Sequence, residues 1–103
     1  MIGQAAVEQA YKSFNRRFFD NKLPKDTELK IVYIPGLLGY QLGEQIVLNK
    51  KYRTDSVWKA TLLHEMAHLK LEDDPSHEKS FHGKKFQKEM LRLAKCGAFK
   101  GIW

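Results

Sequence analysis

Cysteine is nearly missing from this chain of 103 residues, in which Cys96 is the single representative. One thiol forms no internal disulfide and builds no metal centre of several thiolates, so any metal must have other ligands. This usage is typical of a reducing compartment, and we expect a cytoplasmic protein. Long apolar runs are missing too, and the N-terminal MIGQAAVEQAYKSF lacks a basic segment followed by an apolar one. We therefore expect neither a signal peptide nor a membrane partner.

Acidic residues are outnumbered, since twelve Asp and Glu stand against eighteen Lys and Arg, which gives a formal net charge of +6. An excess of positive charge favours acidic partners such as nucleic acid. Hydrophobic residues make up 43% of the chain and aromatic residues 12%, as in globular proteins. The length suits one domain, residues 1–103, and we expect a monomer.

Three segments have the apolar spacing of helices. Residues 5–19 place one apolar stripe on a first helix, formed by Val7, Tyr11, Phe14 and Phe18. A second helix is predicted from about residue 56 to 71, after Thr54 or Asp55 as its cap. A third begins near His82 and ends at Gly97, which suits a left-handed terminator.

Three short runs rich in β-branched and aromatic residues predict strands at residues 28–34, 37–42 and 45–49. Turns at Pro35-Gly36 and Gly43-Glu44 separate them. Connections this short leave no room for a crossover helix, so we expect mainly antiparallel pairing. The predicted fold class is α+β, with three helices packed on a small, mainly antiparallel three-stranded sheet.

The second helix contains the sequence HEMAH, residues 64–68. Residues four apart lie on one helical face, so His64 and His68 can direct two imidazoles at one ion. Zinc accepts imidazole nitrogen, and a catalytic zinc keeps a fourth position open for water. Glu65 then has the role of general base toward that water. The alternative is a core helix whose two histidines are hydrogen bonded to neighbours.

A catalytic site needs a third ligand, for which the sequence offers three residues. His82 is favoured because it shares a helical face with Phe86, Glu89 and Leu93. Glu89 is the alternative that a thermolysin-like site would use, or it orients a ligand imidazole. His77 lies in a polar loop and is the remaining alternative. The metzincin pattern is excluded because it requires glycine and histidine where Leu71 and Asp74 stand.

Three segments resemble the SprT-like metallopeptidases, the family of SprT and of the Spartan protease domain: FNRRFFDNKLP, HEMAH and HGKKFQKEMLRLA. The resemblance implies a zincin-like core with one Zn²⁺ held by His64, His68 and His82 and with Glu65 as general base. It also implies protein substrates, including proteins bound or crosslinked to DNA. Longer relatives carry a zinc ribbon after this core, and the chain has no cysteine pairs for one. Any DNA contact, single-stranded or duplex, is therefore expected from the core itself.

The third helix carries a basic stripe that could follow a phosphate backbone, unless it is only a solvated face: Lys84, Lys88, Arg92 and Lys95. Further basic residues that could extend it are Arg16, Arg17 and Lys22. Trp58 or Trp103 could stack on a base, and Tyr40 could polarise a scissile carbonyl, although tryptophan and tyrosine more often pack in cores.

The leading functional hypothesis is a zinc endopeptidase whose peptide substrate pairs with an exposed strand, residues 45–49 or 38–42. The alternative is a zincin-fold scaffold that binds DNA or protein and holds a structural zinc, with His77 as a fourth ligand. A hydrolase of small amides is a third reading, which a deep closed pocket would favour.

Overall fold

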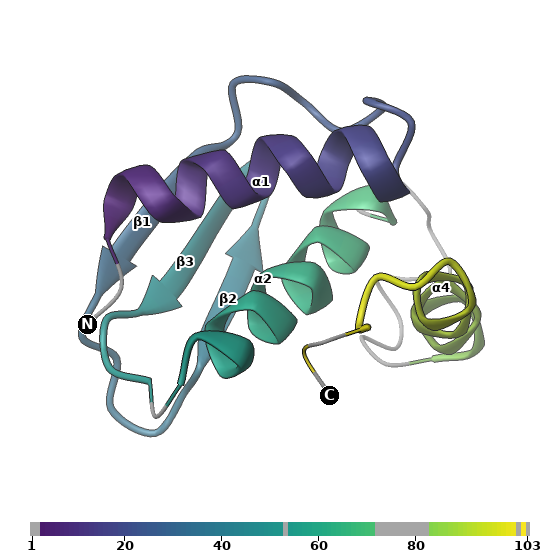
Figure 1. The fold of residues 1–103 in the computed structure, drawn as a ribbon. Coiled ribbons are helices and arrows are strands. Elements are labelled where there is room, and N and C mark those ends of the chain that lie inside the picture. The colour runs from purple at the N-terminus through teal and green to yellow at the C-terminus, as the bar shows by residue number, and fades with distance from the viewer. Residues whose placement is uncertain (1–2, 53, 72–82, 101, 103) are drawn as a thin grey trace.

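The computed structural model describes residues 3–52, 54–71, 83–100 and 102, and within them it has three helices and one three-stranded sheet (Figure 1). The helices are α1 (Gln4–Phe18), α2 (Asp55–Lys70) and α4 (Lys84–Lys95). The strands are β1 (Glu28–Val32), β2 (Gly39–Leu42) and β3 (Gln45–Asn49). The predicted α+β class and the order of its elements are confirmed. None of the described helices combines the length and the apolar character of a membrane span.

The sheet is mixed, with strand order β1-β3-β2. β2 and β3 form the expected antiparallel hairpin, in which Leu42 is opposite Gln45. The prediction that the pairing is mainly antiparallel is wrong for β1, which pairs with β3 in parallel. β3 lies between the two strands that precede it, so the loop of residues 33–38 passes over the end of β3 without any crossover helix. The Asn49 side chain at that end holds the loop, donating to the carbonyls of Ile34 (2.7 Å) and Leu37 (2.8 Å).

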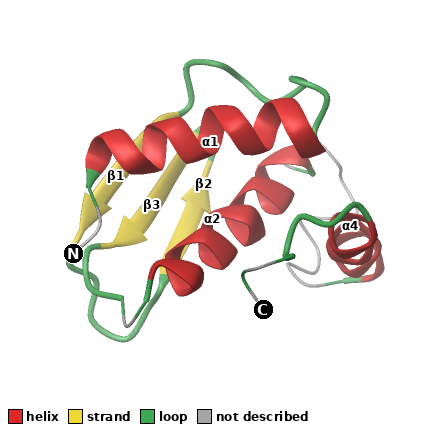
Figure 2. Cartoon of the chain, viewed as in Figure 1, coloured by secondary structure: helices red, strands yellow, loops and turns green. Residues whose placement is uncertain are grey.

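Helices α1 and α2 cover the same face of the sheet (Figure 2). The predicted stripe of α1 is buried, and it packs in the core with alternate residues of β3 and with most of α2. Ile46 and Leu48 of β3 point into this core, whereas Val47 between them belongs to the opposite face. Because α2 lies between the sheet, α1 and α4, it is apolar almost all round, and ten of its sixteen residues are buried.

Two local motifs fix the ends of the outer helices. After α1 the chain turns through Asp20 and Asn21, both in the left-handed region, and the side chain of Asn15 accepts from and donates to the backbone of Leu23 at 3.1 Å. After α4, Gly97 has φ of 84°, and the amide of Ala98 donates to the carbonyl of Leu93 at 2.9 Å. Glycine adopts this conformation without steric cost, so the prediction of Gly97 as terminator is confirmed.

Candidate active site

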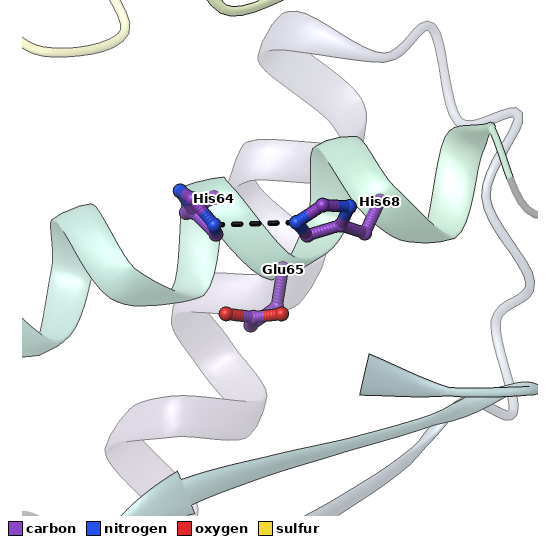
Figure 3. A group of neighbouring side chains, drawn as sticks. All are labelled: His64, Glu65 and His68. Atoms are coloured by element: carbon purple, nitrogen blue, oxygen red, sulfur yellow. Dashed lines mark hydrogen bonds between the residues drawn. The ribbon is translucent and has the colours of Figure 1, made fainter. Parts of the chain in front are cut away.

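His64, Glu65 and His68 lie together in the second half of α2 (Figure 3). The Nε2 atoms of the two histidines are 3.2 Å apart, and the ring centroids are 4.9 Å apart. His68 is buried, with 6% of its surface exposed, whereas His64 is half-buried. The predicted pairing of two imidazoles on one helical face is therefore present.

Phe86 of α4 supports both imidazole rings. Its ring stacks on His68 with centroids 4.3 Å apart, and it meets His64 edge to face at 4.9 Å. Phe86 is 5% exposed and cannot shift without disturbing the core. The sequence placed this residue on the buried face of α4, but its contact with the histidines was not predicted. Spacing along one helix gives no sign of this contact, because Phe86 and the two histidines belong to different helices.

The histidine pair fits a zinc ion. Two imidazole nitrogens that each lie about 2.0–2.1 Å from a tetrahedral zinc are about 3.3–3.4 Å apart, close to the 3.2 Å observed here. Among the described residues, the group able to hold a metal consists of His64, Glu65 and His68, whose ligand atoms all lie within 4.8 Å of one another. The predicted third ligand, His82, and the alternative His77 fall outside the described residues.

Glu65 extends from α2 beside the two histidines, on the side that faces the strands (Figure 3). It is 6% exposed, and this burial raises the pKa of its carboxyl to about 7. Burial penalises the charged form, and a cation nearby has the opposite effect. A metal on the histidines would thus favour the carboxylate that a general base requires.

A pocket of about 460 Å³ opens next to His64 and Glu65. One wall is the loop from Gly36 to Gly39, and the others are the outer side of α2 and Met90 of α4. A carboxylate and an imidazole therefore face a space large enough for a side chain of another molecule.

Comparison with protein families agrees with the presence of a metal-capable group. The model of the SprT-like family matches residues 7–101, which include all described parts of the site. The chain belongs to the SprT-like family. This is generally a family of metallopeptidases with a zincin-like fold, so the architecture and the metal-capable histidines agree with membership. A search of curated proteins found none that matches the chain.

Glu89 of this SprT-like chain, which was predicted as an alternative metal ligand or a partner of a ligand imidazole, lies between two basic side chains. Its buried carboxylate accepts from Lys70 at 2.8 Å and from two nitrogens of Arg92 at 2.9 and 2.6 Å. Burial alone would raise the pKa of Glu89, but the hydrogen bonds and charges of Arg92 and Lys70 outweigh it and hold the pKa below its ordinary value. Glu89 therefore joins α4 to the end of α2, and the metal-capable group of the described chain does not include it.

Tyr40 was predicted as a residue that could polarise a carbonyl, but it points away from the site. A Cβ atom on the preceding Gly39 would lie 3.3 Å from Thr61 of α2, so Gly39 faces the helix and Tyr40 faces the opposite side of the sheet.

Tyr52 supports the site, and it was not predicted from the sequence. The Tyr52 hydroxyl donates to the carbonyl of Leu38. Burial raises the pKa of this hydroxyl, and hydrogen bonds with Asn49 and Thr61 offset the increase only in part. Tyr52 thus fixes the loop that forms one wall of the pocket.

The predicted basic stripe is divided in the structure. Lys84, Lys88 and Lys95 are exposed, whereas Arg92 is bound to Glu89 and lies over the ring of Phe19 at 5.4 Å. Trp58 is 5% exposed and its indole N–H donates to Asp55, so it is not placed to stack on a base. Trp103 lies outside the described residues.

A second basic surface lies across α2 from the pocket. We call it the basic cleft, a hollow of about 930 Å³ between α1, the first half of α2 and the segment after α4. Its basic lining residues are Lys12, Arg16, Arg17, Lys59 and Lys100. Within the described ranges no ion pair involves any of these five, and Asp55 is the one acidic residue of the lining. Arg16 and Arg17 were predicted as contacts, and the structure groups them with three basic residues that the sequence did not suggest.

Proposed function

We propose that this SprT-like chain is a zinc-dependent endopeptidase. The observation that carries the proposal is the 3.2 Å separation of the His64 and His68 nitrogens, with the Glu65 carboxyl beside them at an open pocket. Imidazole donors suit zinc, and three protein ligands leave a position for water. His82 is the proposed third ligand, in keeping with its predicted place on the helical face of Phe86 and Glu89 and with the family resemblance.

Each residue has a defined part in the proposed reaction. His64 and His68 would hold the ion, and Phe86 keeps their rings in place. When bound, zinc supplies polarisation of the scissile carbonyl and acidifies water. Glu65 accepts the proton of the attacking water on a carboxylate oxygen and later donates it to the departing amine nitrogen.

The substrate is proposed to lie along β2. β3 is the central strand and has both edges paired, so the hypothesis that a peptide pairs with residues 45–49 is wrong. β2 is an edge strand next to α2 and the pocket. The carbonyl of Leu38, which directly precedes β2, accepts from the amide of Asn49, and hydrogen-bonded pairs alternate along an antiparallel ladder. The backbone groups of Gly39 are therefore directed away from β3, on the side where an extended peptide can pair with them.

Proteins held on nucleic acid are the proposed substrates, and the basic cleft supports this part of the proposal. Five cations without an ion-pair partner in the described chain form a site for a phosphate backbone, whether single-stranded or duplex. The cleft and the pocket lie on different sides of α2, so both can be occupied together. A cytoplasmic location is also proposed, since the single cysteine, Cys96, is free and exposed.

The test is cleavage of a DNA-binding protein by the zinc-loaded chain, with no DNA, with single-stranded DNA and with duplex DNA. We expect cleavage that DNA accelerates, and no acceleration in the double variant Arg16→Ala, Arg17→Ala. The double variant Lys84→Ala, Lys88→Ala, which changes two exposed lysines outside the cleft, is the matched control and should still respond to DNA. Cleavage that ignores DNA would remove the nucleic-acid part. A zinc-loaded chain that cleaves nothing would favour the binding scaffold with a structural zinc.

A further inference from the structure

Helix α4 contributes to the metal-capable site through its position beside α2. Figure 1 shows α4 next to α2, the helix on which it mainly packs. The buried residues of α4 are Phe86, Glu89 and Leu93, which form one stripe along the helix. Phe86 touches both imidazoles, and the proposed third ligand, His82, directly precedes the N-cap Gly83 in the sequence. The position of α4 therefore governs the support of both histidines and the end of the segment that carries the third ligand.

Glu89 differs from the two apolar members of this stripe because it is ionised at neutral pH, since its pKa lies below the ordinary value. Its carboxylate accepts from Nζ of Lys70, at the end of α2, and from Nε and Nη2 of Arg92. The Arg92 guanidinium also lies over the ring of Phe19, which directly follows α1. We call Lys70, Glu89 and Arg92 the charge clamp. It joins α4 to the ends of α1 and α2.

The charge clamp fixes the position of α4 more closely than apolar packing would. Burying charges costs free energy that ion pairing recovers only in part, so an apolar side chain in place of Glu89 would often stabilise the fold as much. A carboxylate that accepts three directed hydrogen bonds is satisfied in one position, whereas apolar surfaces attract one another without direction. One residue along a helix is a rise of about 1.5 Å, and metal–ligand distances tolerate about 0.2 Å. A helix that supports a metal site therefore needs a fixed position of this kind.

We propose that Glu89 is a positioning residue for the metal site and that it acts through α4. The charge clamp holds Phe86 against the two histidines and sets the approach of the proposed third ligand, His82. Among the described residues, none of the three clamp side chains belongs to the metal-capable group. The inference rests on the proposed zinc site. It predicts that zinc affinity, which is measurable without any cleavage, depends on a carboxylate outside that group.

The experiment compares the wild-type chain with Glu89→Gln and with Glu89→Leu, in which an apolar side chain takes the place of the carboxylate. Zinc affinity is measured by competition with a chromophoric chelator, and the absorption spectrum of the Co²⁺-loaded protein reports the geometry of the ligands. We expect both variants to bind zinc about 10- to 100-fold more weakly, as when a group that orients metal ligands is lost, and to change the cobalt spectrum. Urea unfolding should find Glu89→Leu at least as stable as Glu89→Gln.

Further variants separate positioning from a general loss of stability. Tyr11→Phe removes a buried hydroxyl that donates to the carbonyl of Pro24 and bonds with Thr27, in a part of the core away from the clamp. It should lower stability but keep the wild-type zinc affinity and cobalt spectrum. Lys70→Met removes the partner of Glu89 on α2 and should weaken zinc binding as the Glu89 variants do. Lys70→Arg keeps a cation there and should restore most of the affinity.

The outcomes separate this inference from the proposed function. A Glu89→Leu variant with wild-type zinc affinity and cobalt spectrum would overturn the positioning role, and so would a Tyr11→Phe variant that loses as much affinity. Zinc binding that the double variant His64→Ala, His68→Ala leaves unchanged would overturn the metal site, and with it both proposals. Weaker zinc binding in the Glu89 variants, with no cleavage by the zinc-loaded wild-type chain, would support the positioning role and overturn the endopeptidase.

Discussion

Replacing Glu89 by glutamine removes the negative charge that Lys70 of α2 and Arg92 of α4 share. The carboxylate is 6% exposed and accepts three hydrogen bonds, of 2.6 to 2.9 Å. Hydrogen bonds to charged groups contribute about 1.5–3 kcal/mol each, and breaking a fully buried ion pair costs about 3–5 kcal/mol. Here the side chains of Lys70 and Arg92 are 41% and 37% exposed and regain water. We expect a loss of about 2–3 kcal/mol in the free energy of unfolding, or roughly 10–20 °C in Tm.

The assay is urea unfolding of both proteins as a function of pH. The pKa of Glu89 in the folded chain lies below the ordinary glutamate value of about 4.3. Its stabilisation is therefore complete above that ordinary value and disappears as the pH falls through the lower folded-state pKa. The difference between wild type and variant should be constant near neutral pH and shrink below about pH 4. Glu28→Gln, which breaks an exposed pair with Lys30, is the control and should change stability by under about 0.5 kcal/mol. A Glu89→Gln variant as stable as this control would show that the charge of Glu89 does not stabilise the contact between α2 and α4.

Three further predictions concern the site and its support. Phe86→Ala should cost about 3–5 kcal/mol and weaken zinc binding in a competition with a chromophoric chelator, because both imidazoles lose the ring that orients them; unchanged zinc affinity would contradict this. Removing zinc with a chelator should lower the free energy of unfolding by about 2.7 kcal/mol relative to protein in free zinc at 100 times Kd, as differential scanning calorimetry would detect; an unchanged Tm would argue against a site built into the core. Asn49→Ala should cost about 1–3 kcal/mol and speed amide hydrogen exchange in residues 34–38, since two carbonyls of that loop lose their donor; exchange at the wild-type rate would show that the loop is held by other contacts.

Local patterns predicted the elements, because each depends on residues close together in the chain. The apolar stripe of α1, the buried face Phe86-Glu89-Leu93 and the terminator Gly97 all follow from helical spacing and backbone sterics. The pair His64 and His68 follows in the same way from one helical turn.

Features that join distant segments were missed or wrong. Nothing local indicates that β3 lies between β1 and β2, because strand order depends on packing against α1 and α2. Lys70, one partner of Glu89, is nineteen residues away on α2, and the other, Arg92, is three residues away on α4. Spacing along α4 did not indicate the contact with Lys70 and suggested a metal role for this carboxylate. The basic cleft combines α1, α2 and the segment after α4, whereas the sequence indicated the α4 stripe and, among the cleft residues, only Arg16 and Arg17.

The catalytic role of Glu65 is measurable by comparing the wild-type chain with a variant that keeps the metal but lacks the carboxylate. The initial rate of cleavage of one protein substrate is measured for the wild-type chain and for Glu65→Gln, each shown by metal analysis to contain one zinc per chain. We expect full zinc content in both proteins and a rate at least about 10²-fold lower in the variant, because the general base is lost. Cleavage by zinc-loaded Glu65→Gln at the wild-type rate would contradict this role of Glu65.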